Sequence, residues 1–228
     1  MAILLNIDTA TDVASVCLSH NGDIAGLEKN AEQKEHASFV HTAISKIVES
    51  SGIYISKIDA VAVTAGPGSY TGLRVGMATA KGVCYALKKP LITINTLTVM
   101  AQAAADTLIT SGAHNTATLL CPMIDARRME VFTALYNMHL EIVLPPVAMI
   151  IEPLSFNQWT GDNKVFFFGN GSEKCKPFLQ RDNSVFINSS HSAVHLSKLA
   201  GKAFEKEEFA DIAYAEPIYL KQFHTGKV

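Results

Sequence analysis

The residues best suited to chemistry are a carboxylate at the end of an apolar run and two histidines near the C-terminus. Asp8 follows the strand-like run 2–7, a place typical of catalytic carboxylates and also of ordinary turn residues. His191 and His195 are four residues apart, so on a helix they would share one face. Two ligands do not complete a metal site, and the Glu of H-E-x-x-H is missing. We therefore favour a solvated helix face and predict no metal.

A glycine-rich stretch at residues 61–76, VAVTAGPGSYTGLRVG, combines a β-branched strand, a Gly-Pro-Gly turn and the start of a helix. We predict Thr71 as the N-cap of this helix. The backbone N–H groups of such a turn could cradle an anion. Alternatively, the row Gly72, Gly76 and Ala80 on one helix side could admit a partner backbone, or the helix could pack on its own sheet. Spacing leaves all three open, but no Walker A loop is present.

Two further segments could each bind a ligand or form an ordinary turn. Gly169-Asn170-Gly171 follows an aromatic run and could approach a nucleotide or form an ordinary strand-to-helix turn. Arg127 and Arg128 beside Asp125 could meet a phosphate or a carboxylate, although a solvated hairpin turn is favoured. No G-x-S-x-G nucleophile motif occurs, so the sequence predicts no catalytic residue.

Composition limits the functional classes. The chain has 228 residues, of which 48% are hydrophobic, and a net charge of −2, so it can build a core but lacks the basic excess of a protein that holds long nucleic acids alone. No 18-residue apolar run or signal peptide is present, which predicts a cytoplasmic protein without a membrane span. Widely spaced cysteines in apolar contexts predict reduced, buried thiols at Cys17, Cys84, Cys121 and Cys175.

The order of predicted elements indicates an α/β fold. Up to residue 95 we read strands 2–7, 13–19 and 24–29, a helix 36–50, a strand 58–64, a helix 73–87 and a strand 91–94, which together predict a mixed five-stranded sheet flanked by helices. Strands alternate with short helices again beyond residue 116, and Pro145-Pro146 confines the stretch 142–151 to an edge or a bend. We predict two related domains, residues 1–98 and 99–228, with the second reduced.

Several motifs resemble one family along nearly the whole chain. AGPGSYTGLRVG resembles the signature of the bacterial TsaB (YeaZ) family, and LLNIDTATDVASVCL resembles its opening strands. IDARRMEVFTALY resembles the family's Asp-Ala-Arg segment, and residues 167–171 resemble its Gly-x-Gly turn. PIYLK resembles the near-terminal Pro-x-Tyr-Leu-Arg, with Lys221 in place of the arginine.

The resemblance implies a two-domain actin-like ATPase (ribonuclease H-like) fold and a non-catalytic partner of TsaD. TsaD, with the ATPase TsaE, transfers threonylcarbamoyl from threonylcarbamoyl-adenylate to the tRNA adenosine beside the anticodon. The resemblance also implies a heterodimer with TsaD, a homodimer when alone, and tRNA contact only through the complex. No cofactor is expected to bind tightly, and ATP or ADP is expected only in the complex with TsaD and TsaE. The rival interpretation is an autonomous glycoprotease-like or kinase-like hydrolase of the same fold.

The resemblance also implies roles for individual residues. The metal-binding H-x-x-x-H of the catalytic relatives is missing, because the stretch 96–114 contains only His114. We expect two helices to form the partner interface through Phe39, Val40, Ala43, Ile47, Thr71, Gly72, Arg74, Val75, Gly76, Thr79, Ala80 and Val83. A vestigial nucleotide or anion site is expected to comprise Asp8, Thr9, Gly66, Gly68, Ser69, Gly169 and Gly171.

Overall fold

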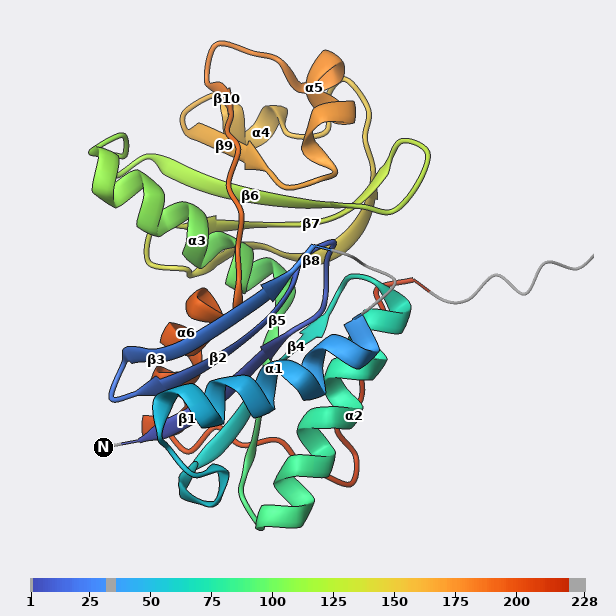
Figure 1. The fold of residues 1–228 in the computed structure, drawn as a ribbon. Helices are drawn as coiled ribbons and strands as arrows, with labels where there is room; N and C mark the ends of the chain where they lie inside the picture. Colours follow the sequence, from blue (N-terminus) through green and yellow to red (C-terminus); the bar gives the residue numbers. More distant parts are fainter. Residues whose placement is uncertain (1, 32–35, 222–228) are drawn as a thin grey trace, which may run out of the picture. The chain divides into compact units, whose positions relative to one another are not determined.

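The chain divides into two compact units (Figure 1), and the computed structural model describes residues 2–31 and 36–221. The first unit combines Met1–Val99 with His191–Ile218, and the second combines Met100–Ser190 with Tyr219–Val228. The predicted division into 1–98 and 99–228 therefore needs correction. The chain returns to the first unit because the apolar side of its last helix covers a face of the first sheet.

The first unit contains a mixed five-stranded sheet, as predicted. Its strands are β1 (Ile3–Asp8), β2 (Ala14–His20), β3 (Asp23–Asn30), β4 (Ala60–Gly66) and β5 (Leu91–Asn95), in the order β3-β2-β1-β4-β5. The β1–β2 and β2–β3 pairs are antiparallel, whereas β1–β4 and β4–β5 are parallel. Asn21 and Gly22 make the predicted hairpin turn with φ of 54° and 89°. The carboxyl ends of β1 and β4 consequently meet at one sheet edge.

Helices cover both faces of this sheet. The helices α1 (His36–Ser51) and α2 (Tyr70–Leu87) pack on the face that carries Leu5 and Ile7 of β1, with the short η2 (Ile55–Lys57) nearby in sequence. The helix α6 (Ala193–Glu205) packs on the opposite face, where Leu4 of β1 belongs to one apolar cluster with Leu196 and Ala200 of the helix. Successive strand residues alternate between faces, so one strand supplies both cores.

The second unit repeats this sheet topology. Its strands are β6 (Thr118–Asp125), β7 (Glu130–Asn137), β8 (Ile142–Ile150), β9 (Lys164–Phe168) and β10 (Ser184–Phe186), in the order β10-β9-β6-β7-β8. An antiparallel meander is again followed by two parallel strands, which confirms the duplicated architecture. The proline-containing β8 lies at an edge, as predicted. This duplication is the actin-like, ribonuclease H-like arrangement.

The helices of the second unit are shorter. They are α4 (Asn157–Thr160) and α5 (Ser172–Leu179), while α3 (Thr96–Ser111) begins in the first unit and ends in the second. Phe156 and Phe167 form the centre of the apolar core, with ring centroids 5.3 Å apart in an edge-on arrangement. Within the described residues, no helix is long and apolar enough to cross a membrane.

Candidate functional site

Asp8 lies at the carboxyl end of β1, and its side chain is completely buried. The Oδ1 atom accepts hydrogen bonds from Thr64 Oγ1 at 2.9 Å and from the backbone N of Ala10 at 3.2 Å. The Oδ2 atom lies 3.4 Å from His191 Nε2, and that nitrogen is also 3.3 Å from Thr11 Oγ1. The carboxylate predicted at the strand end is therefore enclosed by polar groups of its own unit.

The two histidines do not share a helix face, which corrects the sequence prediction. His191 precedes α6. Its side chain lies next to Asp8 and is only 8% exposed, so it is not solvated. His195 is the third residue of α6, where its Nδ1 accepts a hydrogen bond from the backbone N of Ser192 at 3.0 Å in a capping box. In residues 2–31 and 36–221, no three His, Cys, Asp or Glu side chains gather closely enough to hold a metal ion.

The Gly-Pro-Gly turn is occupied by contacts with its own chain. A Cβ at Gly66 would lie 2.5 Å from the backbone O of Ile218, and a Cβ at Gly68 would lie 2.1 Å from the O of Ala10. The backbone N of Ser69 donates to that same Ala10 oxygen at 2.7 Å. These glycines therefore allow the close approach of neighbouring backbone, which is the plain interpretation of the turn.

The N-cap of α2 is Ser69, so the prediction of Thr71 was wrong. The Ser69 Oγ accepts a hydrogen bond from the backbone N of Gly72 at 3.3 Å. The backbone N of Ser69, a residue of the expected anion site, thus has a partner within the unit, and so does the backbone N of Gly72. Thr9 is likewise engaged, since its Oγ1 donates to the backbone O of Gly72 at 2.7 Å.

The small residues of α2 also face inward. A Cβ at Gly72 would lie 2.1 Å from the backbone O of Thr9, and a Cβ at Gly76 would lie 2.4 Å from Thr9 Oγ1. Ala80 is completely buried in the core beneath α2. The row predicted to receive a partner backbone instead receives the end of β1 from the same chain.

The apolar stripe of α1 is core as well. Val40, Ala43 and Ile47 are at most 1% exposed and belong to the cluster formed with the sheet. The interface prediction needs correction for the buried positions, which are Val40, Ala43, Ile47, Gly72, Gly76, Thr79 and Ala80. It remains a prediction for the exposed or half-buried ones, which are Phe39, Thr71, Arg74, Val75 and Val83.

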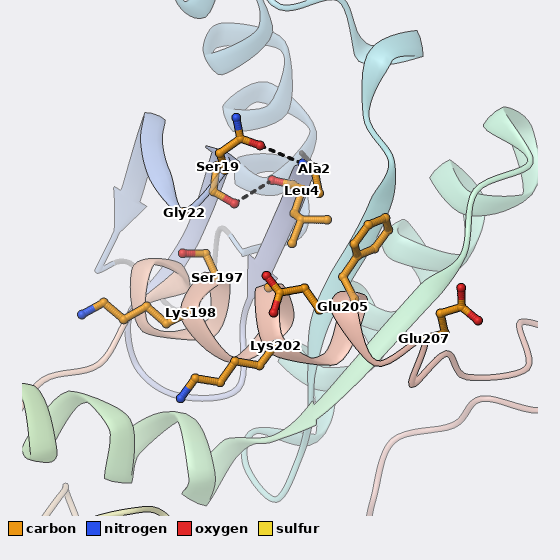
Figure 2. A pocket seen from close by; sticks show the side chains of 12 residues that line it. Ala2, Leu4, Ser19, Gly22, Ser197, Lys198, Lys202, Glu205 and Glu207 are labelled. Carbon is orange, nitrogen blue, oxygen red and sulfur yellow. Dashed lines mark hydrogen bonds between the residues drawn. The ribbon is translucent and has the colours of Figure 1, made fainter.

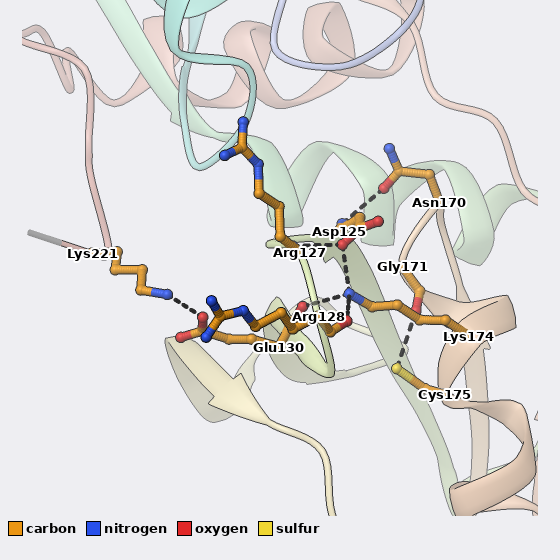
Figure 3. A network of polar contacts seen from close by, with 9 residues as sticks. All are labelled: Asp125, Arg127, Arg128, Glu130, Asn170, Gly171, Lys174, Cys175 and Lys221. Carbon is orange, nitrogen blue, oxygen red and sulfur yellow. Dashed lines mark hydrogen bonds and ion pairs between the residues drawn. The ribbon is translucent and has the colours of Figure 1, made fainter. Parts of the chain in front are cut away.

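A polar network lies at the tip of the β6–β7 hairpin in the second unit (Figure 3). Lys174 Nζ donates to Asp125 Oδ1 at 2.5 Å and to the backbone O atoms of Arg128 and Glu130 at 2.7 and 2.8 Å. The hydrogen bond from Lys174 holds the pKa of the Asp125 carboxyl below its ordinary value. Lys221 forms an ion pair with Glu130. No sequence signal connects Lys174 with the hairpin, because the residues are far apart along the chain.

Gly169 and Gly171 bring the turn after β9 against β6. Gly169 has a φ of +96°, and a Cβ there would lie 2.4 Å from the backbone O of Met123. A Cβ at Gly171 would lie 3.0 Å from the backbone N of Asp125. Between them, Asn170 Oδ1 accepts a hydrogen bond from that same nitrogen at 3.0 Å. The glycines therefore serve a strand-to-helix turn that braces the hairpin.

The cysteines are buried free thiols, as predicted. Burial raises the pKa of the Cys17 thiol to about 12 and that of Cys84 to about 11. Burial also raises the pKa of Cys121 and Cys175. The neutral thiol is thus the stable form near neutral pH, and thiolate chemistry is disfavoured.

A pocket of about 750 Å³ lies beside α6 (Figure 2). Its lining includes Leu4 near the start of β1, whereas Asp8 is the last residue of that strand. Leu4 and Ser19 line it from the sheet, while Ser197 and Glu205 line it from the helix. Ser19 Oγ lies 3.5 Å from the backbone O of Leu4. The pocket therefore shares no lining residue with the buried carboxylate.

A profile of the TsaD family, tRNA N6-adenosine threonylcarbamoyltransferase, matches residues 26–222. The chain belongs to this family. It is 29% identical to the tRNA threonylcarbamoyladenosine biosynthesis protein TsaB of Haemophilus influenzae, over 98% of this chain and 95% of that protein. The structure of YeaZ from Pseudomonas aeruginosa is similar, with a TM-score of 0.81, 26% identity, and coverage of 96% and 100% of the two chains.

A relative described as a transferase matches over a shorter stretch. The tRNA N6-adenosine threonylcarbamoyltransferase of Streptococcus agalactiae is 37% identical over 114 residues, which cover 46% of this chain and 34% of that enzyme. The resemblance to TsaB and YeaZ that the motifs indicated is therefore confirmed over nearly the full length.

Proposed function

We propose that the chain is a non-catalytic partner of a TsaD transferase in the formation of N6-threonylcarbamoyladenosine in tRNA. In this role it supports transfer of threonylcarbamoyl from threonylcarbamoyl-adenylate to the adenosine beside the anticodon, together with TsaE, in the cytoplasm. The observation that carries the proposal is full-length similarity to TsaB alongside similarity to only a third of a transferase.

The geometry at Asp8 supports an accessory role. The carboxylate is buried, with Oδ1 bonded to Thr64 and Oδ2 3.4 Å from His191 Nε2 but without a hydrogen-bond partner among the described residues, and the glycines of the adjacent turn receive backbone oxygens of the same unit. A carboxylate in such surroundings serves the packing of its own domain. We propose that the chain binds no nucleotide tightly by itself and that ATP or ADP binds only in the complex with TsaD and TsaE.

We propose the outward face of α2 as the surface that binds the transferase. A Cβ at Gly82 would meet no heavy atom within 4 Å, so this part of the helix is open. Tyr85 nearby is 81% exposed, and Tyr70 at the start of the helix is 39% exposed. Exposed tyrosines beside small residues suit close helix packing with an aromatic anchor. The proposed face comprises Thr71, Arg74, Val75, Ala78, Gly82 and Tyr85.

The same face would pair two copies of the chain when the transferase is absent. A two-fold homodimer uses one surface twice, so binding of TsaD and self-association are expected to compete. Titration of TsaD into the isolated chain should then convert homodimer to heterodimer in analytical ultracentrifugation.

Reconstitution tests the proposed function. The reaction would contain this chain, TsaD, TsaE, ATP, threonylcarbamoyl-adenylate and unmodified tRNA, and modified adenosine would be measured by mass spectrometry. We expect modification to require this chain and to fail whenever TsaD is omitted. Modification that proceeds equally well without this chain would overturn the proposal, as would modification by this chain without TsaD.

A further inference from the structure

The β6–β7 hairpin holds two adjacent arginines in the left-handed backbone conformation, which Gly and Asn adopt more readily than Arg. Arg127 has a φ of +69° and Arg128 has a φ of +48°. Consecutive positive φ values are the reason that Asn-Gly is preferred in tight hairpin turns. The positions therefore carry long cationic side chains at the expense of local backbone preference.

The carboxylates of this hairpin are each engaged by a lysine. Asp125 is paired with Lys174 at 2.5 Å, and Glu130 is paired with Lys221. Within the part of the chain that the structure describes, neither arginine forms an ion pair. The tip consequently presents two guanidinium groups whose charge its own acidic neighbours do not neutralise.

The hairpin is also held in one conformation. Lys174 bonds to the backbone O atoms of Arg128 and Glu130, and Asp125 Oδ1 accepts from the backbone N of Arg127 at 2.7 Å. Figure 3 shows the Arg127 side chain extending away from Lys174. A fixed backbone lowers the entropy lost when exposed side chains bind a ligand.

We propose that Arg127 and Arg128 contact phosphates of the tRNA backbone in the complex. The inference rests on the proposed function. A guanidinium fork matches the geometry of phosphate oxygens. With a net charge of −2, the chain suits a small phosphate contact shared with a partner rather than an extended basic surface. Both arginines are exposed, but the neighbouring apolar residue, Met129, is half-buried rather than exposed. The tip therefore lacks the large exposed apolar anchor typical of protein interfaces.

The test is the double substitution Arg127→Asn with Arg128→Gly. Asn-Gly suits the turn, so the melting temperature should stay equal or rise while both guanidinium groups are lost. Binding of fluorescent unmodified tRNA to the complex of this chain with TsaD would be measured by anisotropy over a range of salt. We expect affinity to fall about 10-fold at low salt, and the slope of log K against log salt to fall by roughly one to two.

Arg181→Ala is the matched control, because Arg181 is exposed in the same unit and the substitution also removes a guanidinium. It should leave tRNA affinity unchanged. Equal tRNA binding by wild type and the double variant, in a complex that still modifies tRNA, would overturn this inference alone. Loss of TsaE binding with unchanged tRNA affinity would also overturn it, by assigning the arginines to an acidic protein. A wild-type chain that does not pair with TsaD would overturn the proposed function itself.

Discussion

Two glycines on α2 separate packing within the chain from binding of a partner. Gly76 and Gly82 lie on the same helix, yet a Cβ at Gly76 would meet Thr9 Oγ1 at 2.4 Å, whereas a Cβ at Gly82 would meet no heavy atom within 4 Å. A leucine at Gly76 must displace Thr9 inside the unit. A leucine at Gly82 projects from the proposed binding face. The two substitutions are chemically identical, so their difference reports only on their surroundings.

The expected stabilities follow from these contacts. Gly82→Leu should stabilise the isolated chain by about 0.8 kcal/mol through helix propensity, which raises the melting temperature by roughly 2–3 °C for a chain of this size. Gly76→Leu gains the same propensity. It also overpacks the core at a cost of about 1–3 kcal/mol and breaks the bond from Thr9 Oγ1 to the O of Gly72, worth about 1 kcal/mol. We expect a net loss of roughly 1–3 kcal/mol.

The assay combines thermal unfolding of the isolated chain with calorimetric titration of TsaD. Gly82→Leu should unfold at a higher temperature than wild type and bind TsaD at least about 10-fold more weakly, because a side chain now stands where close packing is proposed. Gly201→Leu on α6 is the control, since a Cβ added at Gly201 would also meet no heavy atom within 4 Å. It should gain stability without losing affinity. Unchanged TsaD affinity of Gly82→Leu would refute the proposed face, and its destabilisation would show that the space around residue 82 is not open.

Three further predictions concern the buried polar groups and thiols. Because burial raises the pKa of the cysteines, we expect a thiol reagent at pH 8 to leave all four unreacted in the native protein and to react with all four in denaturant. The raised pKa values also mean that the stability contributed by the neutral thiols is present below pH 9 and is lost as pH rises toward about 12. Since Lys174 lowers the pKa of Asp125, stability from this pair should be present above about pH 4 and be lost as pH falls further; Lys174→Met should lower the urea midpoint at pH 7 and flatten this acid dependence. His191→Ala should destabilise the protein by about 1–3 kcal/mol, because it removes a ring that is only 8% exposed and leaves a cavity beside the buried Asp8 carboxylate; a midpoint equal to that of wild type would contradict this.

Much of the fold follows from local pattern, whereas the surroundings of each side chain do not. Apolar periodicity predicted both α1 and the strands around it, because the period of a helix or strand is a local property. The stripe of Val40, Ala43 and Ile47 has the same pattern whether it covers a sheet of its own chain or a partner, so its burial was not predictable. The row of Gly72 and Gly76 was ambiguous for the same reason.

The polar contacts were less predictable still. Asp8 was recognised from its position after a strand, but its neighbour His191 lies at the far end of the sequence and was assigned to a helix face. Thr71 was predicted as the N-cap because the helical pattern was read from Leu73 onward, whereas in the structure the backbone N of Gly72 donates to Ser69 Oγ and the helix begins earlier. The contact between Asp8 and His191 depends on the return of the chain from the second unit, which no local pattern contains.

The return of α6 to the first unit has a consequence for folding during synthesis. Until residues 193–205 leave the ribosome, Leu4, Ala60 and Ile92 form a sheet face without its covering helix. The whole second sheet is synthesised before that helix, so the second unit can complete its core while the first still exposes apolar surface. The first unit thus begins translation before the second, yet its apolar core is completed later. A nascent chain stalled near residue 190 should present the bare face to chaperones.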